Sequence, residues 1–156
     1  MSRKSLVLFV SFLLAGSAAI AARSFTPKAN TRADVKAYVE HAAQHVAKHG
    51  ADCAAFTSPS WAAGDYYIFV AAEDGKTICH PSPKIVGKSV DEIIDVNGKK
   101  VGVALVEAAK SGGGWVDYVW PRPGTTNPVP KSSYAVQVKG PDGKMYMVGS
   151  GGYELK

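Results

Sequence analysis

His80 and Lys131 stand beside aromatic stretches of the sequence and suggest a binding pocket. A lysine and a histidine close to tyrosine hydroxyls suit a small ligand with an anionic or carbonyl end. Burying a lysine head without a partner is costly, so a pocket explains this set of residues better than a plain core does. A plain core remains the alternative for each aromatic ring. The residues predicted to contact the ligand are Tyr67, Phe69, His80, Tyr118, Trp120, Lys131 and Tyr134.

Catalytic motifs give little support for an enzyme. The sequence has no G-x-S-x-G nucleophile elbow, and the glycines at 112–114 lack the following Lys-Ser or Lys-Thr of a phosphate-binding loop. Cys79 and His80 are adjacent in a predicted strand, so they point to opposite faces and cannot readily pair as nucleophile and base. We predict a binding protein that uses no cofactor and no metal. The alternatives are a secreted enzyme that uses His80 or Lys131, and an accessory or structural protein whose pocket has decayed.

His41, His45 and His49 follow one another at intervals of four residues in a predicted helix. Two histidines at this spacing can bind one metal ion. The sequence has no helical glutamate between them in the zincin pattern and no obvious third ligand. We interpret the three histidines as a half-exposed flank of an amphipathic helix, with a metal site as the alternative.

The segment Asp65–Pro81 has the pattern of a β-hairpin that positions His80. Residues 66–71 are aromatic and β-branched, as in a strand, and residues 73–76 read Glu-Asp-Gly-Lys, a turn in which Gly75 can take a positive φ. Residues 77–79 form a second short strand. Pro81 ends the pairing because proline has no N–H to donate.

The remaining elements predict an α+β fold. A helix of about 19 residues begins at Thr31, a good N-cap, and ends at Gly50, with apolar residues on one face. Residues 101–110 form a shorter helix. Three strands follow at 115–120, 131–138 and 144–153, and the proline-rich segment 121–130 is predicted to be an unpaired loop. With the hairpin, these strands make a five-stranded antiparallel sheet on which the long N-terminal helix packs.

The N-terminus has the pattern of an export signal. A positive start, a short apolar stretch and an A-x-A site predict that residues 1–21 are a signal peptide, so the mature domain spans 22–156 in the periplasm or outside the cell. An uncleaved membrane anchor is the alternative. In an oxidising compartment Cys53 and Cys79 can form a disulfide, and two buried free thiols are the alternative. The charge of +5 is spread along the 156 residues without a basic, aromatic-interleaved run, so we predict no nucleic-acid partner.

Four signatures, in order along about 90 residues, make the chain resemble the single Cache domain, the extracytoplasmic small-ligand sensor of bacterial chemoreceptors and sensor kinases. Each is weak alone, and the order and spacing carry the resemblance. The signatures are residues 65–70 with Gly75 and His80-Pro81, residues 95–98, residues 114–124, and residues 130–134 closed by 149–153.

The resemblance implies a PAS-like antiparallel sheet with the long N-terminal helix on its back and a pocket on the other side. Such pockets often take short carboxylates or similar small metabolites. The seven residues named above match the family's pocket-facing motifs, with Lys131 expected to meet a carboxylate. Family receptors continue into a second membrane helix and a signalling module, whereas this sequence stops at Lys156. We therefore expect a binding module that acts without its own transmembrane signalling domain, with a membrane receptor or a histidine kinase as its partner.

Overall fold

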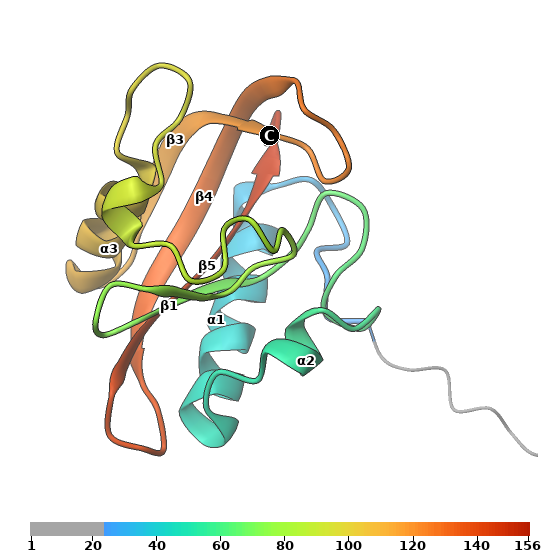
Figure 1. Ribbon diagram of the computed structural model, residues 1–156. Coiled ribbons are helices and arrows are strands. Elements are labelled where there is room, and N and C mark those ends of the chain that lie inside the picture. Colours follow the sequence, from blue (N-terminus) through green and yellow to red (C-terminus); the bar gives the residue numbers. More distant parts are fainter. Residues whose placement is uncertain (1–23) are drawn as a thin grey trace, which may run out of the picture.

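The protein is described here by a computed structural model that covers residues 24–156. Five antiparallel strands form one sheet in the order β2-β1-β5-β4-β3, and helices lie on both of its faces (Figure 1). This confirms the predicted α+β fold. The elements along the chain are α1 (Arg32–His49), α2 (Cys53–Phe56), β1 (Phe69–Ala72), β2 (Thr77–Cys79), the 3-10 turn η1 (Val90–Glu92), α3 (Val101–Lys110), β3 (Gly114–Pro121), β4 (Pro128–Lys139) and β5 (Met145–Tyr153).

Helix α1 covers one face of the sheet. The Thr31 side chain accepts a hydrogen bond from the Asp34 backbone N–H at 3.1 Å, which caps the first turn, and Gly50 ends the helix with a φ of 79°. Its apolar side chains pack with the even-numbered residues of β1 and with β5. The buried residues of this core include Tyr38, Ala42, Val46, Phe56, Trp61, Ile68, Val70 and Val148. The helix bounds and the caps are those predicted from the sequence.

Helix α3 covers part of the opposite face, where a second core lies. Val101, Leu105 and Ala109 are buried against Phe69 and Met147 of the sheet. Gly102 lets the start of α3 approach η1 closely, because an added Cβ would lie 2.2 Å from the Val90 carbonyl oxygen. Since α3 has 10 residues and α1 has 18, this face is covered less completely than the other.

Two predicted strand boundaries and one loop are corrected. Strand β1 begins at Phe69 rather than Tyr66, and β4 begins at Pro128 rather than Lys131. Pro128 and Pro130 pair with β3, although this stretch was predicted to be an unpaired loop. Pairing between β4 and β5 starts only at Lys131, so residues 128–130 pair with β3 alone. Proline has no N–H to donate, which is tolerated here because the other side of the strand has no partner strand.

The predicted signal peptide, residues 1–21, lies outside the residues that the structure describes. Within residues 24–156, no helix has the length and the apolar character needed to cross a membrane.

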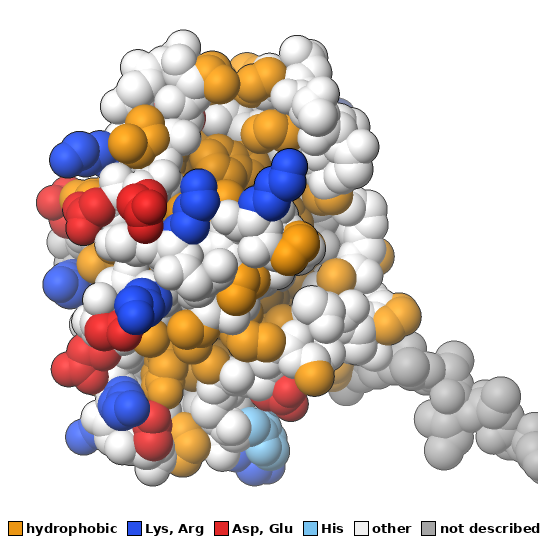
Figure 2. Space-filling model, in the orientation of Figure 1, with side chains coloured by type: hydrophobic (Ala, Val, Ile, Leu, Met, Phe, Trp, Pro, Cys, Tyr) orange, Lys and Arg blue, Asp and Glu red, His pale blue; other side chains and the backbone are white. Residues whose placement is uncertain are grey.

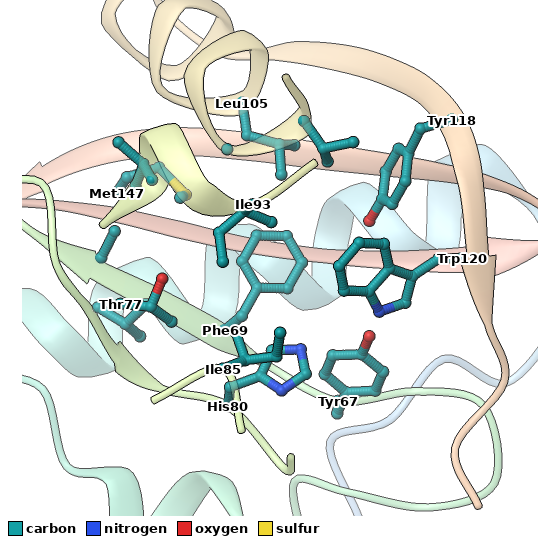
Figure 3. A pocket seen from close by; sticks show the side chains of 15 residues that line it. Tyr67, Phe69, Thr77, His80, Ile85, Ile93, Leu105, Tyr118, Trp120 and Met147 are labelled. Carbon is teal, nitrogen blue, oxygen red and sulfur yellow. The ribbon is translucent and has the colours of Figure 1, made fainter. Parts of the chain in front are cut away.

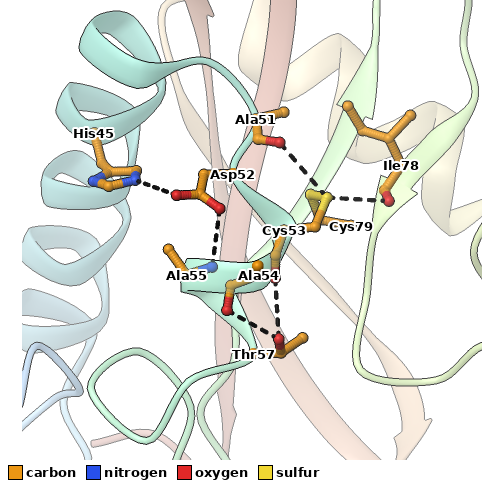
Figure 4. Close-up of a disulfide and its surroundings, with 9 residues drawn as sticks. All are labelled: His45, Ala51, Asp52, Cys53, Ala54, Ala55, Thr57, Ile78 and Cys79. Atoms are coloured by element: carbon orange, nitrogen blue, oxygen red, sulfur yellow. Dashed lines mark hydrogen bonds and ion pairs between the residues drawn. A yellow bond between two sulfur atoms is a disulfide. The ribbon is translucent and has the colours of Figure 1, made fainter.

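A disulfide joins Cys53 at the start of α2 to Cys79 at the end of β2 (Figure 4). Their Cα atoms are 5.2 Å apart, within the usual range for a disulfide. Cys79 is buried in the core under α1, so the bond ties the edge of the sheet to the segment that follows α1.

Replacing both cysteines by alanine should lower the free energy of unfolding by about 3 kcal/mol, because the bond closes a loop of 26 residues in the unfolded chain. Urea unfolding of the parent and of the Cys53→Ala/Cys79→Ala variant measures the difference. Reduction of the parent should give a similar loss, whereas equal stability of all three forms would contradict a disulfide that constrains the chain.

Candidate functional site

The hairpin of β1 and β2 places Tyr67, Phe69 and Thr77 on the face that α3 leaves partly open. Gly75, with a φ of 80°, completes the turn, and the Gly75 N–H donates to the Ala72 carbonyl at 3.0 Å. Because side chains alternate along a strand, Tyr67 and Phe69 point to this face while Ile68 and Val70 enter the core under α1.

A cavity of about 40 Å³ lies between this face, η1 and α3 (Figure 3). One water needs about 10–15 Å³ by the same measure, so the cavity has room for a ligand of only a few non-hydrogen atoms. Most of its wall is apolar. The lining residues are Tyr67, Phe69, Val70, Ala71, Thr77, His80, Ile85, Val90, Ile93, Val101, Gly102, Leu105, Tyr118, Trp120 and Met147.

A wider groove of about 650 Å³ adjoins the cavity. Tyr67, His80, Ile85 and Trp120 line both spaces, so they form the wall between the cavity and the outside. Figure 2 shows apolar side chains exposed in this hollow, between the loops 95–99 and 122–127, with cationic side chains at its rim. The groove is a direct route by which a ligand can enter.

Lys131 lies behind the cavity wall and is only 2% exposed. Its Nζ donates to the Tyr67 hydroxyl at 2.7 Å and lies 4.2 Å and 5.0 Å from the ring centres of Tyr67 and Tyr153. In residues 24–156, no carboxylate oxygen lies within 4.0 Å of this Nζ. Burial lowers the pKa of Lys131 to about 7, an effect that the more distant Asp65 charge opposes.

Lys131 was predicted to contact the ligand, but it lines neither the cavity nor the groove, and its Nζ meets the hydroxyl of Tyr67, which lines both. Burial raises the pKa of Tyr67, so its phenol stays protonated. The Tyr67 oxygen accepts from Lys131 and keeps its own proton to donate.

His80 lines the cavity with its ring edge-on to Tyr67, at 5.1 Å between ring centres. Burial, reinforced by the Lys131 charge, lowers the pKa of His80 to about 4, so the imidazole is neutral at pH 7. The Ser82 backbone N–H donates to Nδ1 at 2.9 Å. Nδ1 is therefore the acceptor, and Nε2–H is left as a donor.

Tyr118 and Trp120 come from β3 and line the cavity from the same face of the strand, because side chains alternate along it. Burial raises the pKa of Tyr118, whose hydroxyl shares a hydrogen bond of 2.8 Å with the fully buried Ser133. Figure 3 shows the hydroxyls of Tyr67 and Tyr118 both directed toward the Trp120 ring. This end of the cavity therefore offers O–H and N–H donors from four side chains.

Tyr134 lies on the other face of the sheet, so the prediction that it contacts the ligand is corrected. It follows Lys131 by three residues, and an odd separation along a strand reverses the face. Its ring packs against Trp115 at 5.3 Å and under the Lys36 Nζ of α1 at 5.6 Å. Applying the period of two along β4 would have separated Tyr134 from Lys131.

Sequence reasoning missed most of the apolar wall. Nothing local in the sequence marked Ile85, Ile93 or Met147, which are far apart in sequence and meet only when the sheet is assembled. Thr77 was also missed.

Asp95 was named only within the signature at residues 95–98, and it anchors the loop beside the groove. Its carboxylate accepts from the backbone N–H groups of Asn97 and Lys99 at 2.9 Å and of Val119 at 3.2 Å. Burial alone would raise the pKa of Asp95, but these hydrogen bonds outweigh it and lower the pKa. The residue ties the 95–99 loop to β3 next to Trp120.

The helix histidines lie away from the cavity, on α1. His41 packs with Phe25 and Trp61, and His45 lies 3.8 Å from Asp52 through Nε2. Within residues 24–156, no three histidine, cysteine, aspartate or glutamate side chains are grouped as metal ligands.

Known proteins resemble this chain along most of its length. The sequence profile of the Single Cache domain 2 family matches residues 18–154. The sensor histidine kinase MctS of Rhizobium johnstonii is 36% identical over 90 residues, 57% of this chain and 19% of that protein. The methyl-accepting chemotaxis protein McpP of Pseudomonas putida is 36% identical over 91 residues, 57% of this chain and 16% of that protein. The chain thus matches less than a fifth of either relative.

Solved structures agree with this family. A periplasmic sensor domain of a chemotaxis protein is 32% identical, with a TM-score of 0.61, and the match covers 78% of this chain and 94% of that one. A Cache chemosensory domain described for its carboxylic acid recognition is 30% identical, with a TM-score of 0.52 and coverage of 76% and 73%. With the fold, the cavity opposite the long helix and the profile match, this chain belongs to the single Cache domain family of extracytoplasmic sensors.

Proposed function

We propose that this domain binds a short organic carboxylate outside the cytoplasmic membrane and reports its presence to a chemoreceptor or sensor histidine kinase. The buried Lys131 ammonium carries the proposal. It has one hydroxyl partner in the described residues and no carboxylate close by, which is unfavourable unless an anion completes the site.

The polar end of the cavity supports an anion rather than a cation or an amine. The donors there come from Tyr67, Tyr118, His80 and Trp120. A carboxylate near pH 7 presents only acceptors. The relative described for carboxylic acid recognition agrees with this chemistry. The small volume and the apolar remainder of the wall favour an acid with a short carbon chain.

We propose binding without catalysis. Cys79 is held in the disulfide and has no thiol to offer, which removes the Cys79–His80 pair as a nucleophile and base. His80 is fixed by Ser82, and Lys131 is enclosed by tyrosine rings, so each is held as a donor of hydrogen bonds.

Lys131→Met should weaken the binding of a short carboxylate by about tenfold or more, because the variant lacks the cation behind Tyr67 that favours an anion in the cavity. A thermal-shift screen of short carboxylates, amides and amino acids identifies the ligand, and calorimetry compares the variants. Tyr134→Phe is the matched control and should bind as the parent does, since Tyr134 faces α1. The proposal fails if only uncharged compounds bind, or if Lys131→Met binds the acid as tightly as the parent.

Carboxylate affinity should fall as pH rises above 7. In the domain without ligand, the pKa of Lys131 is about 7. A bound anion raises this pKa, so binding above pH 7 requires the uptake of a proton by Lys131. Below pH 7 Lys131 is protonated both with and without ligand, and His80 stays neutral down to about pH 5. The carboxylate affinity should therefore not change with pH in this range. Titrations from pH 6 to 9 should show a loss on the order of tenfold or more in the parent and none in Lys131→Met. If the affinity of the parent and that of Lys131→Met changed equally with pH, Lys131 would not be the group that takes up the proton.

Without ligand, Lys131→Met should be more stable than the parent. The pKa of Lys131 is 10.5 in the unfolded chain and about 7 in the fold, so its protonation opposes folding most at and below pH 7 and least near pH 10. The free energy of unfolding of Lys131→Met should exceed that of the parent by about 1–4 kcal/mol at pH 6 and by less at pH 9. Urea unfolding measures the difference.

Lys139→Met makes the same change at an exposed site on β4 and should leave stability nearly unchanged. A Lys131→Met variant that is less stable than the parent at both pH values would show that Lys131 serves the fold rather than the ligand.

A further inference from the structure

Thr77 is a polar side chain in the otherwise apolar end of the cavity. The other polar lining side chains, those of Tyr67, His80, Tyr118 and Trp120, gather at the opposite end (Figure 3). Thr77 is 7% exposed, and within residues 24–156 its hydroxyl makes no hydrogen bond. Figure 3 shows the oxygen pointing toward the side of the cavity where Met147 and Ile93 lie.

A β-bulge turns Thr77 into the cavity. Val70 pairs with Cys79 and Ala71 pairs with Thr77, so Ile78 is an extra residue in β2. Val70 and Cys79 belong to the core under α1, whereas Ala71 and Thr77 line the cavity.

The backbone of Thr77 is held on both sides, which fixes where its side chain points. Its N–H donates to the Lys88 carbonyl at 2.9 Å, and its carbonyl accepts from the Gly87 N–H at 2.7 Å. The hydroxyl is thus presented to the cavity by a rigid backbone, as a group that selects a ligand must be.

A hydroxyl in this position is unfavourable if the ligand is purely apolar there. Valine has nearly the same shape and leaves no buried polar group to satisfy, whereas threonine needs a partner. The threonine hydroxyl can both donate and accept, so its partner can be a hydroxyl or a carbonyl oxygen.

We propose that the ligand is a short carboxylate that carries a second oxygen, a hydroxyl or a carbonyl, at the end away from its carboxylate, and that Thr77 selects for this oxygen. This rests on the proposed function, which places the carboxylate at the Tyr67 and Tyr118 end. Thr77 would then distinguish hydroxy or oxo acids from alkyl acids of the same length.

Three pairs of acids of matched size test the proposal, each exchanging a terminal methyl for a hydroxyl: propanoate with glycolate, butanoate with 3-hydroxypropanoate, and pentanoate with 4-hydroxybutanoate. Calorimetry measures the affinity of the parent, Thr77→Val and Thr77→Ser for each acid. In at least one pair the parent should bind the hydroxy acid more tightly than the alkyl acid. Thr77→Val should lose about tenfold for that hydroxy acid and change the alkyl acid less than about threefold.

Thr77→Ser keeps the hydroxyl and should retain the preference, and thermal unfolding checks that all proteins are folded. The selection by Thr77 is overturned if the parent binds the alkyl acid at least as tightly in every pair, or if Thr77→Val weakens both members equally. Either result leaves the carboxylate site itself standing. If the parent binds none of the six acids and no other short carboxylate of the thermal-shift screen, both proposals fail. If Thr77→Val does not fold, the preference of the parent still tests whether the ligand carries a second oxygen.

Discussion

The burial of the Lys131 ammonium against the Tyr67 hydroxyl constrains the rest of the site. Lys131 lies in register with Tyr118 of β3 and Tyr153 of β5, so it is enclosed only when β4 has both neighbours. The charge is unfavourable in this environment, and the rings of Tyr67 and Tyr153 offset part of the cost. The buried lysine therefore lowers the stability of the fold, and this cost is what the proposed anion would offset.

The two faces of the sheet divide stability and binding. The face under α1 is filled by apolar and aromatic side chains and is tied to the sheet edge by the disulfide. The other face is covered by the shorter α3 and by η1, and a cavity remains between them. Because the first face provides a rigid support, the second can hold an incompletely satisfied lysine and an unfilled space.

Charge and tautomer at the polar end follow from the same burial. Burial, reinforced by the charge of Lys131, lowers the pKa of His80, so the imidazole is neutral and accepts a hydrogen bond from the Ser82 N–H. Burial raises the pKa values of Tyr67 and Tyr118, so both hydroxyls stay protonated. The result is one buried cation behind a set of neutral donors.

Local patterns in the sequence determined α1 and its caps, the hairpin turn, α3, the alternation in β3 and the family resemblance, because each depends on residues close together in the chain. The pairing of Pro128–Pro130 was not predictable, since it depends on which strands lie on either side of β4. The period of two along β4 was enough to place Tyr134, whereas the position of Thr77 needed the bulge in the sheet. The cavity wall, with Ile85, Ile93 and Met147, was decided by the tertiary structure alone, because packing brings together residues that share no local signal.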